Sequence, residues 1–133
     1  MSTTIPARRI VGKFRFEVPG QVPSKSNYRF DPRDSSKWTR IGKYQHEVGI
    51  EALRAGAGPL MRKHGGKPVG VEIIAIGQKA DLDNQRKIIY DGLEGVAFEN
   101  DRQVISDRGE MLPDDGRHAR VRITVVYFEE DEV

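Results

Sequence analysis

Residues 69–94 read VGVEIIAIGQKADLDNQRKIIYDGLE, an apolar segment followed by a polar turn and an amphipathic segment. The first nine residues, 69–77, are rich in Val and Ile and predict a buried central strand. Residues 84–94 repeat apolar side chains at the spacing of one helical face and predict a helix. We expect this helix to bury Ile88, Ile89 and Leu93, to be capped at its start by Asp83 or Asn84, and to be capped at its end by Gly95.

Segments on both sides of this stretch continue the mixture of strands and helices. Residues 13–18 and 119–128 alternate polar and apolar side chains, which predicts two strands. Residues 43–55 carry apolar side chains at spacings of three and four and predict a second helix. Weaker signals indicate an extended loop over 19–42, a short helical piece at 60–63, a short strand at 103–107 and a turn over 109–117.

The order of these elements predicts an α+β fold in which two main helices pack on one mixed β-sheet. The chain has 133 residues, of which 37% are hydrophobic and 32% are charged, as in soluble globular domains. This length suits one core. We therefore expect a single domain over residues 1–133, with flexible tails at 1–12 and 129–133.

Composition excludes several classes of site. The chain contains no cysteine, so disulfide bonds, zinc held by thiolates and a cysteine nucleophile are all excluded. Residues 1–15 carry four cations but no apolar run of the length of a signal peptide, and no stretch has the length and apolarity of a transmembrane span. A cytoplasmic protein without a membrane partner is the expectation.

Charge is distributed unevenly along the chain. Residues 1–70 carry 14 Lys and Arg against 5 Asp and Glu, and residues 71–133 carry 8 against 15, so the halves have net charges of +9 and −7. A basic half beside an acidic half is typical of a surface that binds a polyanion next to a site that needs carboxylates. Mutual attraction of the halves within the fold is the alternative interpretation.

Two aspartates flank one apolar residue at the turn before the helix. Asp81 and Asp83 would point to one face of an extended backbone, with Leu82 on the other. Adjacent carboxylates repel one another, and a divalent cation removes that repulsion. Oxygen ligands favour Mg²⁺, or Mn²⁺ as a substitute, over zinc. Asp101, which follows the helix, offers a third carboxylate.

Lys87 lies one turn into the same helix, where its ammonium could face bound ions or a phosphate. Carboxylates that hold a metal, with a lysine nearby, suit phosphodiester hydrolysis. A structural interpretation fits the same spacing: Asp83 caps the helix, Asp81 is a solvated loop residue, and Lys87 pairs with Asp91. Spacing by itself leaves both interpretations open.

The combined pattern resembles the RusA family of Holliday-junction resolvases. Residues 81–93 contain the acidic pair, the Asn, the Lys one turn later and the Asp-Gly-Leu of the helix end. Residues 100–104 contain an acidic turn before Gln-Val. Residues 23–29, Pro-Ser-Lys-Ser-Asn-Tyr-Arg, resemble the Pro-Ser-x-Asn motif that follows the family's first strand. By order of elements, the resemblance extends over residues 14–127.

This resemblance implies a homodimeric, Mg²⁺-dependent endonuclease that cuts four-way DNA junctions by paired symmetric nicks in recombination and repair, in a bacterium or its phage. It implies that Asp81, Asp83 and Asp101 are catalytic metal ligands and that Lys87 is the catalytic lysine. One departure concerns Asn100-Asp101, where the family commonly has two aspartates. We align the second of these with Asp101, which retains the ligand.

A group of cations and motif residues is expected to contact DNA. Phosphate contacts of this kind add salt dependence rather than base specificity. Each cation taken singly also fits a solvated surface position. The candidates are Lys25, Asn27, Tyr28, Arg29, Arg33, Lys37, Arg40, Lys43, Arg86 and Arg102.

A metal-dependent phosphohydrolase that acts on nucleotides fits the same carboxylates, although the basic N-terminal half suits a long polyanion better than a small substrate. Two further functions also compete with a nuclease. The first is a catalytically inactive protein of the same fold that binds junctions, against which the retained Asp81, Asp83, Lys87 and Asp101 argue. The second is an interaction protein that recruits partners through its acidic C-terminus, residues 129–132.

Overall fold

Four strands form one mixed sheet in the order β1-β4-β2-β3. The computed structural model describes residues 8–24 and 36–130, and for residues 36–39 the backbone alone. The central strand β4 pairs antiparallel with both β1 and β2, whereas β3 runs parallel to β2 at the edge. The strands span Ile10–Pro19 (β1), Val69–Ile76 (β2), Val104–Leu112 (β3) and Arg120–Phe128 (β4).

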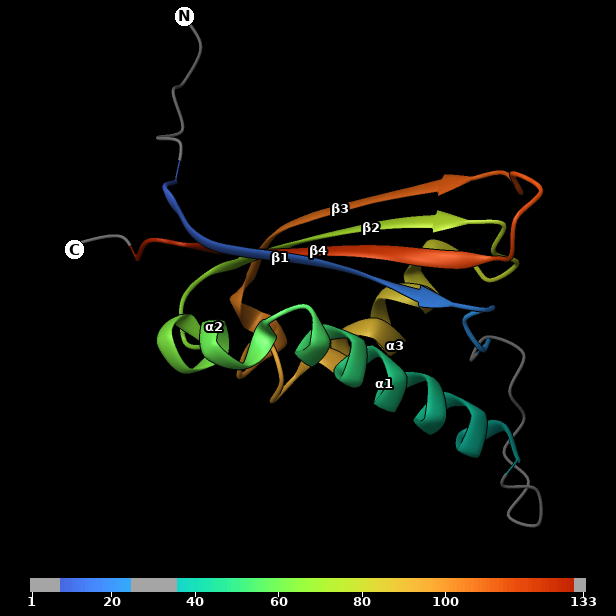
Figure 1. The fold of residues 1–133 in the computed structure, drawn as a ribbon, viewed down its shortest axis with the longest axis horizontal. Helices are drawn as coiled ribbons and strands as arrows, with labels where there is room; N and C mark the ends of the chain where they lie inside the picture. Colours follow the sequence, from blue (N-terminus) through green and yellow to red (C-terminus); the bar gives the residue numbers. More distant parts are fainter. Residues whose placement is uncertain (1–7, 25–35, 131–133) are drawn as a thin grey trace, which may run out of the picture.

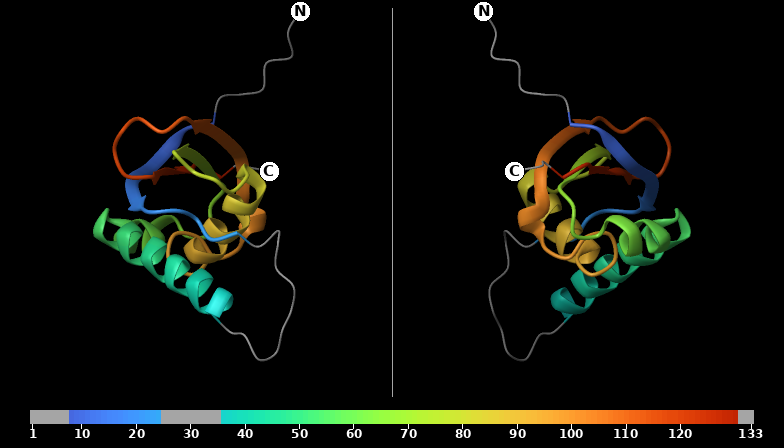
Figure 2. Two further views of the ribbon diagram at one scale, coloured as in Figure 1. Left: turned by 90° about the vertical axis from the view of Figure 1, so that its right-hand side faces the viewer. Right: turned by 90° about the vertical axis from the view of Figure 1, so that its left-hand side faces the viewer.

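The helices cover one face of this sheet (Figures 1 and 2). Helix α1 packs against β1 and against α3, and the shorter α2 packs near the start of β1. A single 3₁₀ turn, η1, leads directly into β3. The bounds are Ser36–Arg54 (α1), Ala57–His64 (α2), Leu82–Leu93 (α3) and Asp101–Gln103 (η1).

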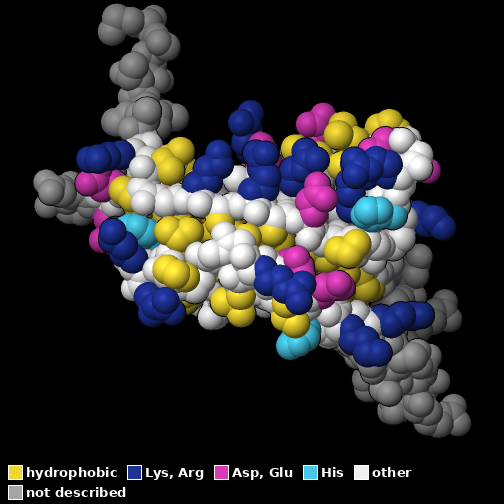
Figure 3. All heavy atoms as spheres, in the orientation of Figure 1, with side chains coloured by type: hydrophobic (Ala, Val, Ile, Leu, Met, Phe, Trp, Pro, Cys, Tyr) yellow, Lys and Arg dark blue, Asp and Glu magenta, His cyan; other side chains and the backbone are white. Residues whose placement is uncertain are grey.

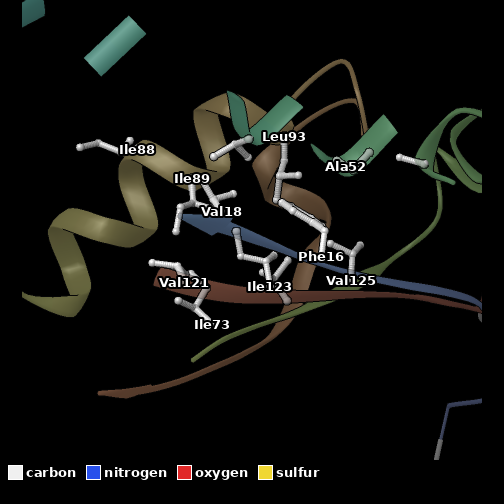
Figure 4. Close-up of a cluster of buried hydrophobic side chains, with 14 of the residues drawn as sticks. Phe16, Val18, Ala52, Ile73, Ile88, Ile89, Leu93, Val121, Ile123 and Val125 are labelled. Atoms are coloured by element: carbon white, nitrogen blue, oxygen red, sulfur yellow. The ribbon is translucent and has the colours of Figure 1, made fainter. Parts of the chain in front are cut away.

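The core lies between the sheet and the helices (Figure 4). Strand β1 alternates, with Phe14, Phe16 and Val18 buried and the residues between them exposed. From α3, Ile88, Ile89 and Leu93 are fully buried, as the helical spacing predicts. The α+β class, the mixed sheet and the helices packed on it are thus confirmed.

Helix α1 begins at Ser36, seven residues before the predicted start, so the expectation of a loop over residues 36–42 is wrong. Ile41 is buried and precedes Tyr44 by three residues, which extends the buried stripe of the helix by one turn. The polar composition of this segment favours a solvated loop, but Arg40 lies on the exposed side of the helix while Ile41 is buried.

Strand β3 continues to Leu112, so the predicted turn over 109–117 begins too early and the predicted strand is too short. β3 pairs with β2 from Val104 opposite Val69 to Leu112 opposite Ile76, with one irregularity between Val104 and Ser106. Pairing along a complete neighbouring strand outweighs the turn preference of Gly109. No local sequence pattern reports this pairing.

Three smaller expectations also change. Helix α3 begins at Leu82, and its N-cap is Asp81 rather than Asp83 or Asn84. The short helical piece at 60–63 is part of α2, and residues 10–12, which were assigned to a tail, lie in β1. A fourth expectation, the capping of this helix end by Gly95, is also wrong: the C-cap is Glu94, whose N–H donates to the Tyr90 carbonyl, and the N–H of Gly95 donates to the Phe98 carbonyl instead.

Candidate functional site

The N-terminus of α3 positions both aspartates of the acidic pair. Asp81 is extended (φ −71°, ψ 165°), and its Oδ1 accepts the backbone N–H of Asn84 at 2.8 Å. Asp83 lies in the first turn, with its side chain 86% exposed. The positive end of the helix dipole favours carboxylates at both positions. Because Asp83 is helical, the argument from an extended backbone is wrong for this pair.

Amide side chains tie the segment after β1 to the turn before α3. Gln21 Nε2 donates to the Gly77 carbonyl at 2.7 Å, and Gln78 Nε2 donates to the Gly20 carbonyl at 2.7 Å. The buried Asn84 donates through Nδ2 to the Pro23 carbonyl at 2.9 Å. The start of the Pro-Ser motif is therefore held beside the acidic pair.

A surface hollow of about 390 Å³ lies along the exposed side of α3. It brings together Asp83, Lys87 and Asp101, three of the four residues predicted to be catalytic, whereas Asp81 is not part of its lining. We call it the α3 hollow and define it by its lining residues: Asp83, Arg86, Lys87, Tyr90, Asp91 and Asp101.

Asp101 reaches the α3 hollow because η1 is held in place by a capping box. The Asn100 side chain accepts the N–H of Arg102 at 2.9 Å, and Gln103 Oε1 accepts the N–H of Asn100 at 2.8 Å. Gln103 also donates to the carbonyls of Gly65 and Lys67, at 2.7 and 2.8 Å. Asn100 is thus used as a cap while Asp101 faces the hollow, which agrees with the alignment that retains a carboxylate at Asp101.

Arg86 connects the acidic pair to the sheet. Its Nη1 lies 2.8 Å from Asp83 Oδ1, and its Nε lies 2.8 Å from Asp107 Oδ1. Burial lowers the pKa of Arg86, but the hydrogen bond and charge of Asp107 outweigh that effect and raise this pKa above its ordinary value. Arg86 therefore remains a cation and compensates the charge of the two carboxylates.

The structure adds two residues that the sequence pattern missed. Tyr90 lines the hollow, and its buried hydroxyl has no hydrogen-bond partner among the residues that the structure describes. Burial, together with the charge of Asp107, raises the pKa of Tyr90, so the phenol stays protonated. Asp107 is 24 residues from Asp83 in sequence, and only the packing of α3 beside β3 reveals their shared partner.

Carboxylate oxygens are the ligands that a hard divalent cation prefers, and two of the three predicted ligands lie in the same hollow. Asp83 and Asp101 line one hollow, and Asp81 Oδ2 is not the oxygen used for capping. Within residues 8–24 and 36–130, however, no three acidic or histidine side chains are grouped closely enough to hold a metal ion. Arg86 takes up part of the charge of Asp83 in this arrangement.

The expected DNA contacts fall into separate regions. Arg40 and Lys43 are exposed in the first half of α1, near which Lys and Arg side chains gather in Figure 3. Arg86 lines the α3 hollow, whereas Arg102 lines a different hollow beside Ile105. The remaining candidates lie outside the described residues: Lys25, Asn27, Tyr28, Arg29, Arg33 and the side chain of Lys37.

Comparison with known proteins identifies one family. The family model described as Endodeoxyribonuclease RusA matches residues 27–126. This range includes α3, η1 and the complete lining of the α3 hollow. No curated protein matches the chain. Among the described helices, none is both long and apolar enough to cross a membrane.

Proposed function

The chain belongs to the RusA family of endodeoxyribonucleases, and we propose that it is an active, Mg²⁺-dependent nuclease that resolves four-way DNA junctions as a homodimer, by one nick in each of two strands. The observation that carries this proposal is the α3 hollow, where Asp83, Lys87 and Asp101 meet although they come from two elements. Helix capping alone accounts for Asp81, but it does not require this grouping.

The residues proposed to hold Mg²⁺, or Mn²⁺ in its place, are Asp81, Asp83 and Asp101. A bound divalent cation would lower the pKa of a water and neutralise charge on the phosphate. For Asp83 to take part, its ion pair with Arg86 at 2.8 Å has to open. Arg86 would keep its ion pair with Asp107, and the guanidinium nitrogen released by Asp83 would then face the hollow.

Lys87 and Arg86 are proposed to act on the phosphate. Both line the hollow, so both can approach an oxyanion placed there. Positive groups already in position stabilise the extra negative charge of a phosphoryl transition state without having to reorganise. Tyr90 lines the same hollow, but its hydroxyl oxygen is buried, so it is not proposed as a donor to the phosphate.

The homodimer is proposed because a four-way junction has approximate two-fold symmetry. A closed two-fold dimer carries two identical sites and can make two equivalent cuts. The cations of α1 are proposed to bind the DNA arms, with Arg40 and Lys43 as the exposed members. A role in recombination or repair follows from this substrate.

The decisive test compares cleavage of a labelled four-way junction with cleavage of a linear duplex of the same sequence. We expect paired nicks near the crossover in Mg²⁺, and none with a chelator. Asp83→Asn should lower the cleavage rate about 100-fold or more while junction binding is retained. Glu47→Gln, which removes a carboxylate charge from the exposed side of α1, is the matched control and should cut normally. Tight junction binding without cutting, in Mg²⁺ or Mn²⁺, would identify a catalytically inactive binding protein instead.

A further inference from the structure

Strand β3 is an open edge of the sheet. It pairs with β2 on one side only, and most of its residues are exposed, including Asp107 through Leu112. Three of the five large hydrophobic side chains that are exposed in the described part of the chain lie on it: Ile105, Met111 and Leu112. An unpaired edge with exposed apolar side chains is a template for pairing with another strand.

The backbone groups of β3 that face away from the sheet can be assigned. The Leu112 carbonyl accepts the N–H of Gly77, so the polar groups of Leu112 face β2. Alternate residues of a strand direct these groups to opposite edges, so Asp107, Gly109 and Met111 direct theirs to the open edge. β3 contains neither Pro nor Lys, two residues that commonly protect such edges.

The charges around Gly109 are self-complementary. Arg108 and Glu110 flank Gly109 and lie on the sheet face away from the helices, since they stand opposite Glu72 and Ile74 of β2. Neither takes part in an ion pair with another residue of the described segments. In an antiparallel pairing of two copies centred on Gly109, each Arg108 stands directly opposite the partner's Glu110.

We infer that β3 is the docking surface for a second copy of this chain, in an antiparallel pairing with its two-fold axis at Gly109. The sheets of the two copies then form one continuous sheet, joined where β3 of one copy pairs with β3 of the other. We call this pairing the β3 seam, and two Arg–Glu pairs cross it. Opposite charges that face one another across paired strands stabilise the pairing, and like charges destabilise it. The same patch on both copies is the form that a closed two-fold interface requires.

This seam lies beside the candidate site. Leu82 of α3 packs against Gly109, because a Cβ added to that glycine would overlap Leu82 Cδ2. Arg86 of the α3 hollow is anchored on Asp107, and η1, which carries Asp101, leads directly into β3. The pairing itself rests on strand geometry and charge, whereas its use in making paired nicks rests on the proposed function.

Charge reversal across the seam tests the register. Arg108→Glu places two acidic pairs across the seam, and Glu110→Arg places two basic pairs there. By analytical ultracentrifugation, each variant should dimerise with a dissociation constant raised about tenfold or more relative to the unmodified chain. An equimolar mixture of the two should form heterodimers, and the double variant R108E/E110R should regain the original dissociation constant. Recovery in the mixture also shows that neither variant is misfolded.

The control lies on a second exposed apolar patch. Leu53 is 54% exposed in a groove between α1 and α3 that is lined by Gly49, Ile50 and Val96. Leu53→Arg should leave dimerisation unchanged. If Leu53→Arg yields a monomer while both charge reversals remain dimeric, or if the unmodified chain is monomeric at high concentration, the β3 seam is wrong. Junction cleavage in the same samples separates the two proposals. If the chain forms a dimer of the predicted register but never cuts a junction, the proposed nuclease activity is wrong and the β3 seam stands. If the dimers cut junctions but neither charge reversal changes their dimerisation, the β3 seam is wrong and the nuclease activity stands.

Discussion

Asp81 Oδ1 accepts the backbone N–H of Asn84 at 2.8 Å, so this carboxylate is the N-cap of α3 as well as a proposed metal ligand. The two roles make different demands on the side chain. An N-cap needs a short side chain with an accepting oxygen, a demand that Asn meets as well as Asp. A metal ligand paired with another carboxylate needs the negative charge.

Substitutions at Asp81 therefore separate stability from catalysis. Asp81→Asn should keep the free energy of unfolding close to its original value, because Asn is an equally good cap, while junction cleavage is lost. Asp81→Ala should also lose cleavage and should lower the free energy of unfolding by about 1 kcal/mol. Urea denaturation and the junction assay measure the two effects. Full cleavage by Asp81→Asn would show that Asp81 only caps the helix.

Arg86 is a protein cation that stabilises the clustered carboxylates at the place where a metal cation is proposed to bind. With Asp83 and Asp107 each at 2.8 Å, it offsets the repulsion that clustered carboxylates otherwise create. Its ion pair with Asp83 is largely exposed, because the aspartate side chain is 86% accessible. Exposed pairs of this kind contribute little free energy, so little opposes their opening when a better ligand arrives.

At the scale of elements, two glycines lie where α1 and α3 meet, and one of them sets the distance between these helices. A Cβ on Gly92 would lie 2.9 Å from the Gln45 carbonyl oxygen and 3.2 Å from Gln45 Cα, both backbone atoms that cannot turn aside. A Cβ on Gly49 would meet its nearest atoms at 3.6 Å, which is ordinary contact. Only Gly92 is therefore required by the close approach of the helices.

Alanine at these two positions should have opposite effects on stability. Gly92→Ala should lower the free energy of unfolding by about 1 kcal/mol or more, because overpacking against backbone outweighs the gain in helix propensity. Gly49→Ala should raise it by up to about 1 kcal/mol, since the added methyl group fits and glycine is unfavourable in a helix. Chemical denaturation of both variants checks this. A stabilised Gly92→Ala variant would mean that α1 and α3 can separate at little cost.

At the scale of the whole molecule, the uneven charge of the chain acquires a spatial meaning. The acidic residues that were predicted as ligands gather along α3 and η1, while exposed cations lie on the first half of α1. Figure 3 shows Lys and Arg side chains near the start of α1 on the face in view. This separation agrees with a DNA-binding region beside an acidic site.

The salt dependence of junction binding tests this assignment. The logarithm of the binding constant falls with the logarithm of salt concentration by about 0.9 per phosphate contact. Replacing both Arg40 and Lys43 by Ala should weaken binding and reduce that slope by about 1 to 2. Arg62→Ala with Lys63→Ala, two exposed cations at the far end of α2, is the matched control and should leave the slope unchanged (Figure 1). Equal slopes for all three proteins would exclude α1 from the DNA interface.

Much of this molecule was determined by local sequence. The apolar run at 69–77, the helical spacing of Ile88, Ile89 and Leu93, and the alternation at 119–128 each predicted the correct element. Such patterns work because a side chain's burial repeats with the period of its own backbone. The acidic pair and Lys87 were visible for a similar reason, since they lie within seven residues of one another.

Only the tertiary structure decided what depends on distant contacts. The full length of β3 follows from its pairing with β2. Asp101 approaches Asp83 because η1 is anchored on the carbonyls of Gly65 and Lys67. Asp107 matters because its carboxylate holds Arg86. The open edge at Arg108 and Glu110 follows from the strand order. Periodicity shows which face of an element is buried, but not which element covers it, because that choice is made by the summed packing of the whole chain.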